Sequence, residues 1–353
     1  MKNVSRNLLI LMTVILLSNT SVISQSSSDP VSIKEITFYS GDFKIAGELK
    51  LPDGIAPHPV ILFVHGDGPN SRNSGGSYPP VMERMLHAGY ATFAWDKPGT
   101  GESTGQFNQS HLLEQRSQIV LDAVRVLKNR PDVDSSRIGM WGISQAGYVM
   151  PMVLLKSNDI AFMIAVSCPG GPGVDQGAYL VARQAVCEGL PEEDVKQVEY
   201  LLSAIERVRS YEEYVRYKEQ LKSYSALNSL KELGFNMRIK PAEEWHADDL
   251  GGNYYWDPMQ VISRTTIPVL ALFGEKDTQV DPFQGMQAYK NALEHAGNKN
   301  FRIELIPGVD HCMIVTKSGC LKEIINRNRK ERLAYEPVFL EIIENWLNEL
   351  NLN

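Results

Sequence analysis

Ser144 is the residue whose surroundings most suggest chemistry. It stands in Met140-Trp-Gly-Ile-Ser-Gln-Ala-Gly147, after an apolar stretch typical of a buried strand and before a helix-forming stretch. Gly142 and Ala146 lie two residues to either side, where a sharp turn from strand to helix leaves room only for small side chains. A serine hydroxyl becomes an effective nucleophile when the backbone presents it to a base. The segment therefore predicts a nucleophile elbow, Gly-x-Ser-x-Gly with Ala146 in place of the last glycine.

A candidate acid and a candidate base follow the serine in the chain. Val269-Leu-Ala-Leu-Phe-Gly-Glu-Lys-Asp277 is an apolar strand pattern that ends in a turn and an acid. Phe301-Arg-Ile-Glu-Leu-Ile-Pro-Gly-Val-Asp-His311 is a later strand pattern and turn that end in histidine. We predict that Ser144 attacks an acyl carbonyl and that His311 takes up its proton. Asp277 would orient the imidazole and stabilise its protonated form.

Two glycine-rich turns lie upstream. One ends Pro59-Val-Ile-Leu-Phe-Val-His65-Gly-Asp-Gly-Pro69, and the other, Lys97-Pro-Gly-Thr-Gly-Glu-Ser103, follows the strand pattern that ends at Asp96. With the serine elbow and the late Gly-Val-Asp-His311, these motifs resemble the α/β-hydrolase superfamily over nearly the whole length after residue 24. The resemblance is strongest to capped serine esterases and acyl hydrolases. It implies an α/β-hydrolase fold: a mostly parallel sheet with helices on both faces, an inserted helical cap and no cofactor.

Two aspartates compete for the role of the acid. In similar proteins the acid follows its strand after a short turn that opens with glycine, as Asp277 does after Gly274. Asp281 is the alternative, but because it precedes Pro282 we interpret it as the N-cap of the next helix. Asp175 and Glu188 are remote candidates. Asp310 neighbours His311 in sequence, but an adjacent side chain would not normally orient that ring.

The negative charge of a tetrahedral intermediate requires preorganised hydrogen-bond donors. We predict that the backbone N–H of Gln145, just after the elbow, and that of Asp67, after His65-Gly66, form an oxyanion hole. A carboxylate near an oxyanion opposes catalysis, so the Asp67 side chain should point away or be paired. His65 is expected to hold this turn through a hydrogen bond and to take no part in the chemistry.

The composition argues against other classes of protein. The chain of 353 residues has a formal net charge of −7 and no basic run, so it offers no footprint for nucleic-acid phosphates. Gly99-Thr-Gly-Glu-Ser103 lacks both the Gly-Lys-Ser/Thr of a phosphate loop and the Rossmann spacing. His246-Ala-Asp-Asp249 is interpreted as a polar loop, and no segment has metal-ligand spacing. We predict a small-molecule acyl substrate without cofactor, metal or nucleic acid.

Apolar runs alternate with helical patterns, which predicts a mostly parallel sheet covered on both faces. A hairpin of 31–39 and 43–51 is expected at the sheet edge. The expected parallel strands are 59–65, 90–95, 137–143, 161–167, 268–274 and 301–306. The expected helices are 79–88, 110–129, 145–156, 283–296 and 336–350.

The alternation stops after the strand at 161–167. Helical periodicity then covers 190–208 and 211–233. We interpret 175–258 as a helical cap inserted into the core; a coiled coil or a partner surface is the alternative. Four aromatic residues near its end are predicted to line the substrate pocket: Trp245, Tyr254, Tyr255 and Trp256.

The N-terminus has the pattern of a signal peptide. Lys2 and Arg6 precede an apolar run that is too short for a transmembrane helix of about 20 residues, and small residues lead to a cleavage site after Ser24. We predict export to the periplasm or medium without stable membrane insertion, with an uncleaved anchor as the alternative. The predicted divisions are 1–24 for the signal peptide, 25–174 and 259–353 for the core, and 175–258 for the cap.

Four cysteines in an exported chain permit disulfides: Cys168, Cys187, Cys312 and Cys320. Cys312 and Cys320 are close in sequence, and a bridge between them would stiffen the loop of His311. Free, partly buried thiols are an equal alternative.

These observations together predict a serine hydrolase that cleaves carboxylic esters through an acyl-enzyme. Thioesterase or acyltransferase chemistry uses the same residues and differs in the leaving group or the acyl acceptor. An exported peptidase of the aminopeptidase type shares the fold and the chain order. A non-catalytic binding protein is less favoured, because such proteins usually lose a triad residue. The natural substrate and the oligomeric state stay open.

Overall fold

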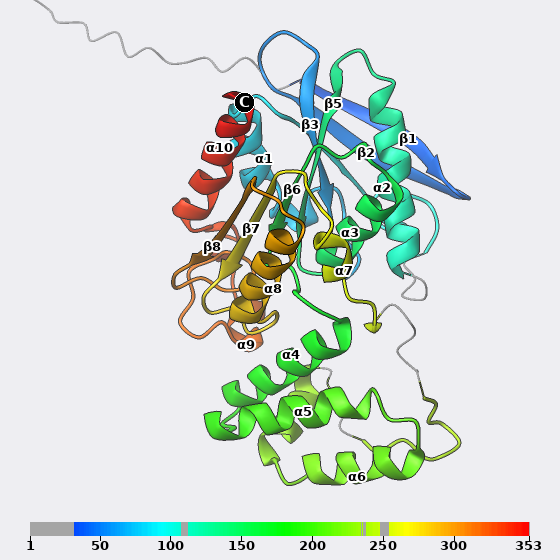
Figure 1. Cartoon of the computed structure of the whole chain (residues 1–353), viewed down its shortest axis with the longest axis vertical. Helices are drawn as coiled ribbons and strands as arrows, with labels where there is room; N and C mark the ends of the chain where they lie inside the picture. The colour runs from blue at the N-terminus through cyan, green and yellow to red at the C-terminus, as the bar shows by residue number, and fades with distance from the viewer. Residues whose placement is uncertain (1–31, 107–111, 234, 236–237, 248–253, 353) are drawn as a thin grey trace, which may run out of the picture. The chain divides into compact units, whose positions relative to one another are not determined.

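The computed structural model of the protein contains one eight-stranded sheet, with strand order β1-β2-β4-β3-β5-β6-β7-β8 (Figure 1). The predicted signal peptide lies outside the described residues, and so do Asp248 and Asp249 of the polar loop. No helix within the described ranges is long and apolar enough to cross a membrane. The structure describes residues 32–106, 112–233, 235, 238–247 and 254–352.

A hairpin forms one edge of the sheet, and parallel strands form the rest. β1 (Ser32–Ser40) and β2 (Phe43–Leu51) are antiparallel, as expected, and β2 pairs antiparallel with β4. The pairs among β3 to β8 are all parallel, so the carboxyl ends of these strands share one edge, where the candidate site residues follow them. The parallel strands are β3 (His58–Val64), β4 (Ala91–Trp95), β5 (Val133–Ile143), β6 (Phe162–Val166), β7 (Val269–Gly274) and β8 (Phe301–Ile306).

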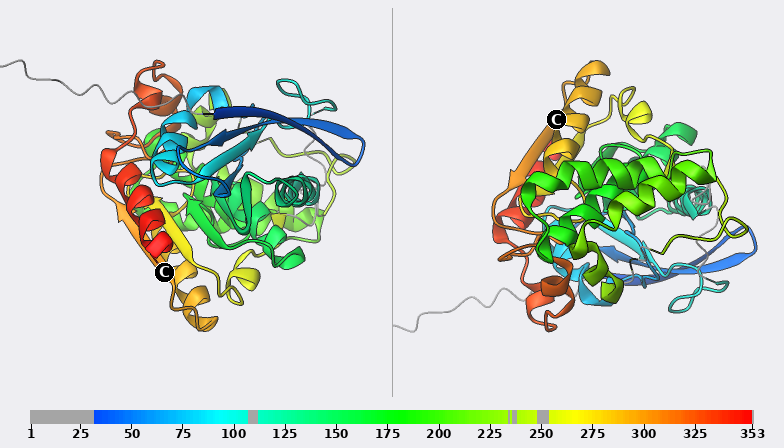
Figure 2. Two further views of the ribbon diagram at one scale, coloured as in Figure 1. Left: turned by 90° about the horizontal axis from the view of Figure 1, so that it is seen from above. Right: turned by 90° about the horizontal axis from the view of Figure 1, so that it is seen from below.

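Helices cover both faces of this sheet, which confirms the predicted α/β-hydrolase fold (Figure 2). α1 (Pro79–His87) and α10 (Pro337–Leu352) pack on one face. α2 (Leu112–Lys128), α3 (Ala146–Lys156) and α8 (Pro282–His295) pack on the other. Shorter elements are η1 (Ser74–Gly76), α7 (Met259–Ile262), α9 (Leu321–Ile325) and η5 (Glu331–Leu333).

A helical insertion separates β6 from β7 (Figure 1). Its apolar side chains, such as Val198, Leu201 and Leu230, form a hydrophobic cluster of their own. This separate cluster lets the insertion hold a defined shape without strands. Its elements are α4 (Gly173–Cys187), η2 (Glu192–Asp194), α5 (Val195–Ile205), α6 (Tyr211–Leu221) and η3 (Ser225–Leu233).

The insertion is also where the sequence prediction was incomplete. No helix was expected at α4, and the run 211–233 is two elements, α6 and η3, rather than one. Gly173 and Gly177 weaken the helical pattern only in the first turns of α4, whereas the residues from Ala178 on include good helix formers. Hydrogen bonds from Tyr179 and Gln184 to the segment after β7 also hold α4.

Candidate active site

Ser144 occupies a strained turn between β5 and α3. Its φ angle is +59°, in the left-handed region that costs a non-glycine residue about 1–3 kcal/mol. The turn is possible because its flanks are small: a Cβ on Gly142 would lie 2.6 Å from the Cβ of Ala146. The Ser144 N–H donates to the Val166 carbonyl at 3.0 Å, which ties the turn to β6. The backbone thus presents Ser144 at the carboxyl edge of the sheet, in the geometry of a nucleophile elbow.

Asp277 and His311 meet in a buried hydrogen bond. Asp277 Oδ2 lies 2.8 Å from His311 Nδ1. The other carboxylate oxygen accepts the N–H groups of Gln279 and Val280 at 2.8 and 2.9 Å, which holds the carboxylate in one orientation. Because an ionised carboxylate only accepts, His311 Nδ1 carries the hydrogen, and Nε2 is left to exchange a proton.

The other candidate acids serve elsewhere. Asp281 is the N-cap of α8 and accepts the N–H groups of Phe283 and Gln284, both at 3.0 Å. The remaining acids form ion pairs: Asp310 with Arg327, Asp175 with Arg207, and Glu188 with Lys322.

No group of three His, Cys, Asp or Glu that could hold a metal ion occurs in the ranges that the structure describes.

Two opposing effects set the proton affinity of His311. Burial lowers the pKa of His311, but the charge and hydrogen bond of Asp277, with the charge of Asp310, raise it by more. The pKa of His311 therefore lies above its ordinary value. A histidine of this kind accepts a proton from a nucleophile only when the pH is high enough to leave it neutral.

The contact between nucleophile and base is not formed. In the part of the chain that the structure describes, no hydrogen bond joins the Ser144 hydroxyl to His311. Contacts of this kind are often long without substrate and shorten in the substrate complex. The structure therefore brings Asp277 and His311 together, and it places Ser144 at the same sheet edge.

Two backbone donors lie beside Ser144. Neither the Gln145 N–H nor the Asp67 N–H donates to another described residue. Both residues line one cavity with Ser144. Gln145 stands at the N-terminus of α3, where the helix dipole favours negative charge. The Asp67 side chain is exposed.

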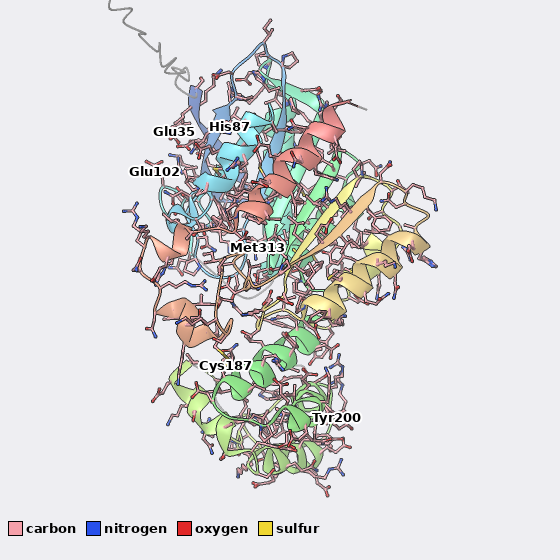
Figure 3. All side chains as sticks on the ribbon, turned by 90° about the vertical axis from the view of Figure 1, so that its left-hand side faces the viewer. Glu35, His87, Glu102, Cys187, Tyr200 and Met313 are labelled. Carbon is pink, nitrogen blue, oxygen red and sulfur yellow. A yellow bond between two sulfur atoms is a disulfide. The ribbon has the colours of Figure 1, made fainter. Side chains whose placement is uncertain are left out.

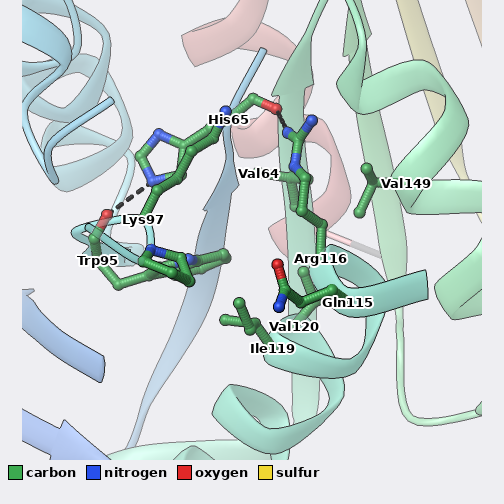
Figure 4. A pocket seen from close by; sticks show the side chains of 10 residues that line it. Val64, His65, Trp95, Lys97, Gln115, Arg116, Ile119, Val120 and Val149 are labelled. Carbon is green, nitrogen blue, oxygen red and sulfur yellow. Dashed lines mark hydrogen bonds between the residues drawn. The ribbon is translucent and has the colours of Figure 1, made fainter. Parts of the chain in front are cut away.

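His65 is buried beneath the turn that carries Asp67 (Figure 4). Its Nε2 lies 2.7 Å from the Trp95 carbonyl and its Nδ1 lies 3.0 Å from the Tyr78 hydroxyl. Since a carbonyl only accepts, Nε2 carries the hydrogen and Nδ1 accepts from Tyr78. Burial, with the charge of Lys97, lowers the pKa of His65 to about 3, so the ring is neutral at physiological pH. The hydrogen bonds hold the turn, as the sequence predicted.

Sequence reasoning missed two buried cations under the same turn, Lys97 and Arg116. Arg116 had a signal, because it interrupts the apolar face of α2 three residues after Leu113 and three before Ile119. Arginine is almost never fully buried unless it is paired, so a core position demands acceptors nearby. Both side chains line a small cavity of about 20 Å³, enough for one water (Figure 4).

The cavity at Ser144 has a volume of about 300 Å³. Core loops form one part of its wall, and α4 of the insertion forms another through Gly173, Gln176, Gly177 and Leu180. A Cβ added at Gly177 would meet no heavy atom of a described residue within 4 Å. The insertion thus contributes directly to the space in front of the serine.

The cavity at Ser144 differs from the pocket of four aromatic residues that the sequence predicted. Tyr254 lines the cavity, but Trp245, Tyr255 and Trp256 do not. Trp245 packs within the insertion, where its ring centroid lies 5.9 and 5.6 Å from those of two tyrosines. The Tyr255 hydroxyl donates to the Glu206 carbonyl, and Trp256 packs against the main core. Large rings fill the insertion's small core because they bury the most apolar area.

The disulfide joins Cys187, at the end of α4, to Cys320, the N-cap of α9 (Figure 3). Of the two alternatives left open, the Cys312–Cys320 bridge is therefore wrong; Cys312 and Cys168 are free thiols, but Cys187 and Cys320 are not. Nearness in sequence favours a bridge between neighbours, but the chain after Cys312 turns toward α4. The Leu321 N–H donates to Gln184 Oε1 of α4 at 2.9 Å.

The parallel sheet, the elbow at Ser144 and the acid–histidine pair at one sheet edge define the class of α/β hydrolases. Residues 55–317 match the model of the Hydrolase_4 family, described as serine aminopeptidase S33, and the chain belongs to this family of hydrolases.

Similar proteins are known as esterases. Esterase EstD of Thermotoga maritima is 26% identical over 276 residues, which cover 76% of this chain and 58% of EstD. The chain thus spans little more than half the length of that relative. Esterase Pf2001 of Pyrococcus furiosus has a TM-score of 0.53 and 17% identity, with 90% of each chain covered. Est1E of Butyrivibrio proteoclasticus, solved with ferulic acid bound, has a TM-score of 0.52 and 18% identity, with 90% and 98% covered. At these identities the structures show likeness of fold alone.

Proposed function

We propose that the protein is a serine hydrolase that cleaves carboxylic esters, with Ser144, His311 and Asp277 as its catalytic triad. The observation that carries the proposal is the buried 2.8 Å hydrogen bond between Asp277 and His311, at the sheet edge where Ser144 stands in its elbow. A carboxylate that orients a histidine serves to activate a serine for attack on a carbonyl. The similarity to an esterase, EstD, adds support.

The reaction would proceed in two halves. Ser144 Oγ attacks the ester carbonyl carbon while His311 Nε2 accepts the hydroxyl proton. The carbonyl oxygen becomes an oxyanion that accepts hydrogen bonds from the N–H groups of Gln145 and Asp67. His311 returns the proton to the leaving alcohol as the C–O bond breaks, which leaves the acyl group on Ser144. Water, deprotonated by His311, then attacks the acyl carbon; His311 returns the proton to Ser144 Oγ as the Oγ–acyl bond breaks, which releases the acid and restores the enzyme.

The helical insertion, residues 175–258, would act as a cap over Ser144. Support comes from Gly177 and Leu180 of α4, which line the cavity of Ser144. Residues from a cap in such a wall limit the size of the bound group and exclude water during turnover. A volume of about 300 Å³ is at the lower end for small-molecule sites, so we infer a medium-sized acyl or alcohol group.

Export would place this activity outside the cytoplasm. The leader pattern at 1–24 and the disulfide between Cys187 and Cys320 support it, because disulfides persist mainly in oxidising compartments. The accessible substrates would then be small esters in the periplasm or medium.

A peptidase is the second candidate, because the family description is that of a serine aminopeptidase. The same triad and oxyanion donors would then attack an amide, and His311 would protonate a leaving amine. Thioester hydrolysis or acyl transfer would also use these residues and differ in the group that leaves or accepts.

One experiment separates these functions. The full chain and its Ser144→Ala variant are assayed on p-nitrophenyl esters from acetate to octanoate, on aminoacyl p-nitroanilides, and with a fluorophosphonate probe. Ester hydrolysis and labelling that both disappear in the variant would support the proposal. Faster turnover of the anilides would move the assignment to a peptidase, and absence of turnover and labelling would leave a binding protein.

A further inference from the structure

Lys97 lies beneath the turn that carries Asp67. Its Nζ donates to the carbonyl oxygens of Gly66 at 2.7 Å and Gly68 at 2.6 Å. The side chain is buried, and desolvation, with the nearby charge of Arg116, lowers the pKa of Lys97 to about 6. A buried ammonium group is costly unless acceptors satisfy it, and here the acceptors are carbonyl oxygens of one turn. The position of Lys97 therefore couples its side chain to the orientation of that turn.

Arg116 reaches the same turn from α2. Its Nη2 donates to the His65 carbonyl oxygen (Figure 4) and to that of Gly66 at 3.1 Å. Its Nη1 donates to Gln145 Oε1. Burial lowers the pKa of Arg116 to about 10, while the charge of Asp67 opposes this effect. One guanidinium thus joins the turn after β3 to the residue that follows Ser144.

The orientation of one peptide group follows from these contacts. The Gly66 carbonyl and the Asp67 N–H belong to the same trans peptide, in which they point in opposite directions. Lys97 and Arg116 hold the Gly66 oxygen on the inner side of the turn. The Asp67 N–H is therefore directed away from them, and Asp67 lines the cavity of Ser144.

We propose that Lys97 and Arg116 are positioning residues of the oxyanion hole, which aim the Asp67 N–H at the developing negative charge. The inference rests on the ester hydrolase proposed above. In this inference the two buried side chains orient a backbone peptide group and do not contact the substrate.

The same cations offset the unexpected carboxylate at position 67. Asp67 raises the proton affinity of both Lys97 and Arg116, so its charge lies within the field of both. Arg116, with a pKa of about 10, stays protonated at neutral pH, and its charge offsets that of Asp67. Asp67 can therefore supply its N–H without its side chain opposing the reaction.

The test compares Lys97→Met and Arg116→Met with the wild-type full chain on p-nitrophenyl acetate. We expect kcat to fall about 100-fold in each variant, since loss of one oxyanion donor costs this much, while KM changes little. Phenylboronic acid, which forms a tetrahedral anion on an active serine, should bind more weakly by a similar factor. A purely structural role would leave the ratio of boronate affinity to KM unchanged.

Three measurements make the comparison specific. Arg130→Met removes an arginine that pairs with Asp132 before β5, at the opposite edge of the sheet, and should keep wild-type kcat. The two test variants should melt below the wild-type temperature, because the carbonyls of the turn lose their donors, and a melting temperature well above the assay temperature shows that they are folded. Arg116→Lys keeps the charge but not the guanidinium fork, and should have an intermediate kcat.

Wild-type kcat and boronate affinity in the methionine variants would overturn this inference and leave the ester-hydrolase proposal standing. If a methionine variant fails to fold, Arg116→Lys decides, and wild-type values for it would overturn the inference. A wild-type protein that hydrolyses none of the esters would overturn both proposals.

Discussion

The acid–histidine pair and the turn after β3 lie on opposite sides of Ser144 along the sheet, and different contacts hold them. On the acid side, α4 of the insertion supplies uncharged hydrogen bonds. The Tyr179 hydroxyl donates to the Asp277 carbonyl at 2.7 Å, and Gln184 Nε2 donates to Thr278 Oγ1 at 2.8 Å. The disulfide from the end of α4 adds a covalent link to the segment before α9.

On the oxyanion side, the core supplies buried charges. Lys97 follows β4 and Arg116 stands on α2, and both bond to carbonyls of the turn after β3. Among the described residues, the side-chain hydrogen bonds to the oxyanion turn come from the core, whereas the acid also receives them from the insertion. Changes in the insertion should affect the base and the substrate cavity but leave oxyanion stabilisation intact.

The largest loss of activity is expected on removing Ser144, because the acid–histidine pair and the oxyanion turn both act on the ester bound to its hydroxyl oxygen. Ser144→Ala should lower ester hydrolysis at least about 1000-fold, and His311→Ala nearly as much, because nucleophile and base act as a unit. Circular dichroism and melting temperature should stay near wild type. Turnover by folded Ser144→Ala close to the wild-type rate would remove the basis for comparing the two sides.

The acid side is tested by a matched pair of substitutions. Asp277→Asn should lower kcat at least about 100-fold, because an amide no longer fixes the tautomer of His311. Asp281→Asn is the control and should keep nearly full activity, since asparagine is also a good N-cap for α8. The kcat values of the two variants check this. The reverse ranking would transfer the role of the acid to Asp281.

The pH profile should separate the two sides. Because the pKa of His311 is raised above 6.5, its neutral form is lost as the pH falls through that raised value, and kcat/KM should then drop about tenfold per pH unit. Asp277→Asn removes the charge that raises this pKa, so its midpoint should move to lower pH. Arg116→Met, on the oxyanion side, should leave the midpoint unchanged. A wild-type midpoint below 6.5 would contradict the account of His311.

Gly177 tests the cavity wall that α4 provides. Gly177→Leu should fill open space and lower kcat/KM for octanoate esters about tenfold or more, with little change for acetate. Trp245→Ala is the control, because Trp245 packs inside the insertion, and any loss should be equal for all esters. Equal loss across the series in Gly177→Leu would mean that the substrate does not occupy this part of the cavity.

The smallest effect on activity is expected from the disulfide. Replacing Cys187 and Cys320 by serine should lower the free energy of unfolding by about 2–5 kcal/mol. Since the hydrogen bonds of α4 remain, kcat should fall at most about tenfold. Denaturant unfolding and initial rates measure both quantities. A loss of boronate affinity in this variant would show that the oxyanion side also depends on the insertion.

Much of the core follows from local sequence. The elbow was predictable because Gly142 and Ala146 must be small at a turn where their side chains would collide. The strands were predictable because parallel strands covered on both faces read as continuous apolar runs. The pairing of Asp277 with His311 follows from the order of these strands, since adjacent parallel strands β7 and β8 bring the loops after them together.

Other features were decided only by tertiary structure. The partner of Cys320 lies 133 residues away, and no local pattern distinguishes Cys187 from Cys312. α4 contains glycines in its first turns that disfavour a helix, and its hydrogen bonds to the segment after β7 also hold it.

The sequence by itself determined the strands, the elbow and the types of residue available for chemistry, because periodicity and turn sterics act between neighbours. Which aromatic side chain lines the cavity, which cysteines bond and which carbonyls meet Arg116 depend on segments far apart in the chain. These contacts exist only after the helical insertion and α2 have packed, so a local sequence pattern cannot predict them.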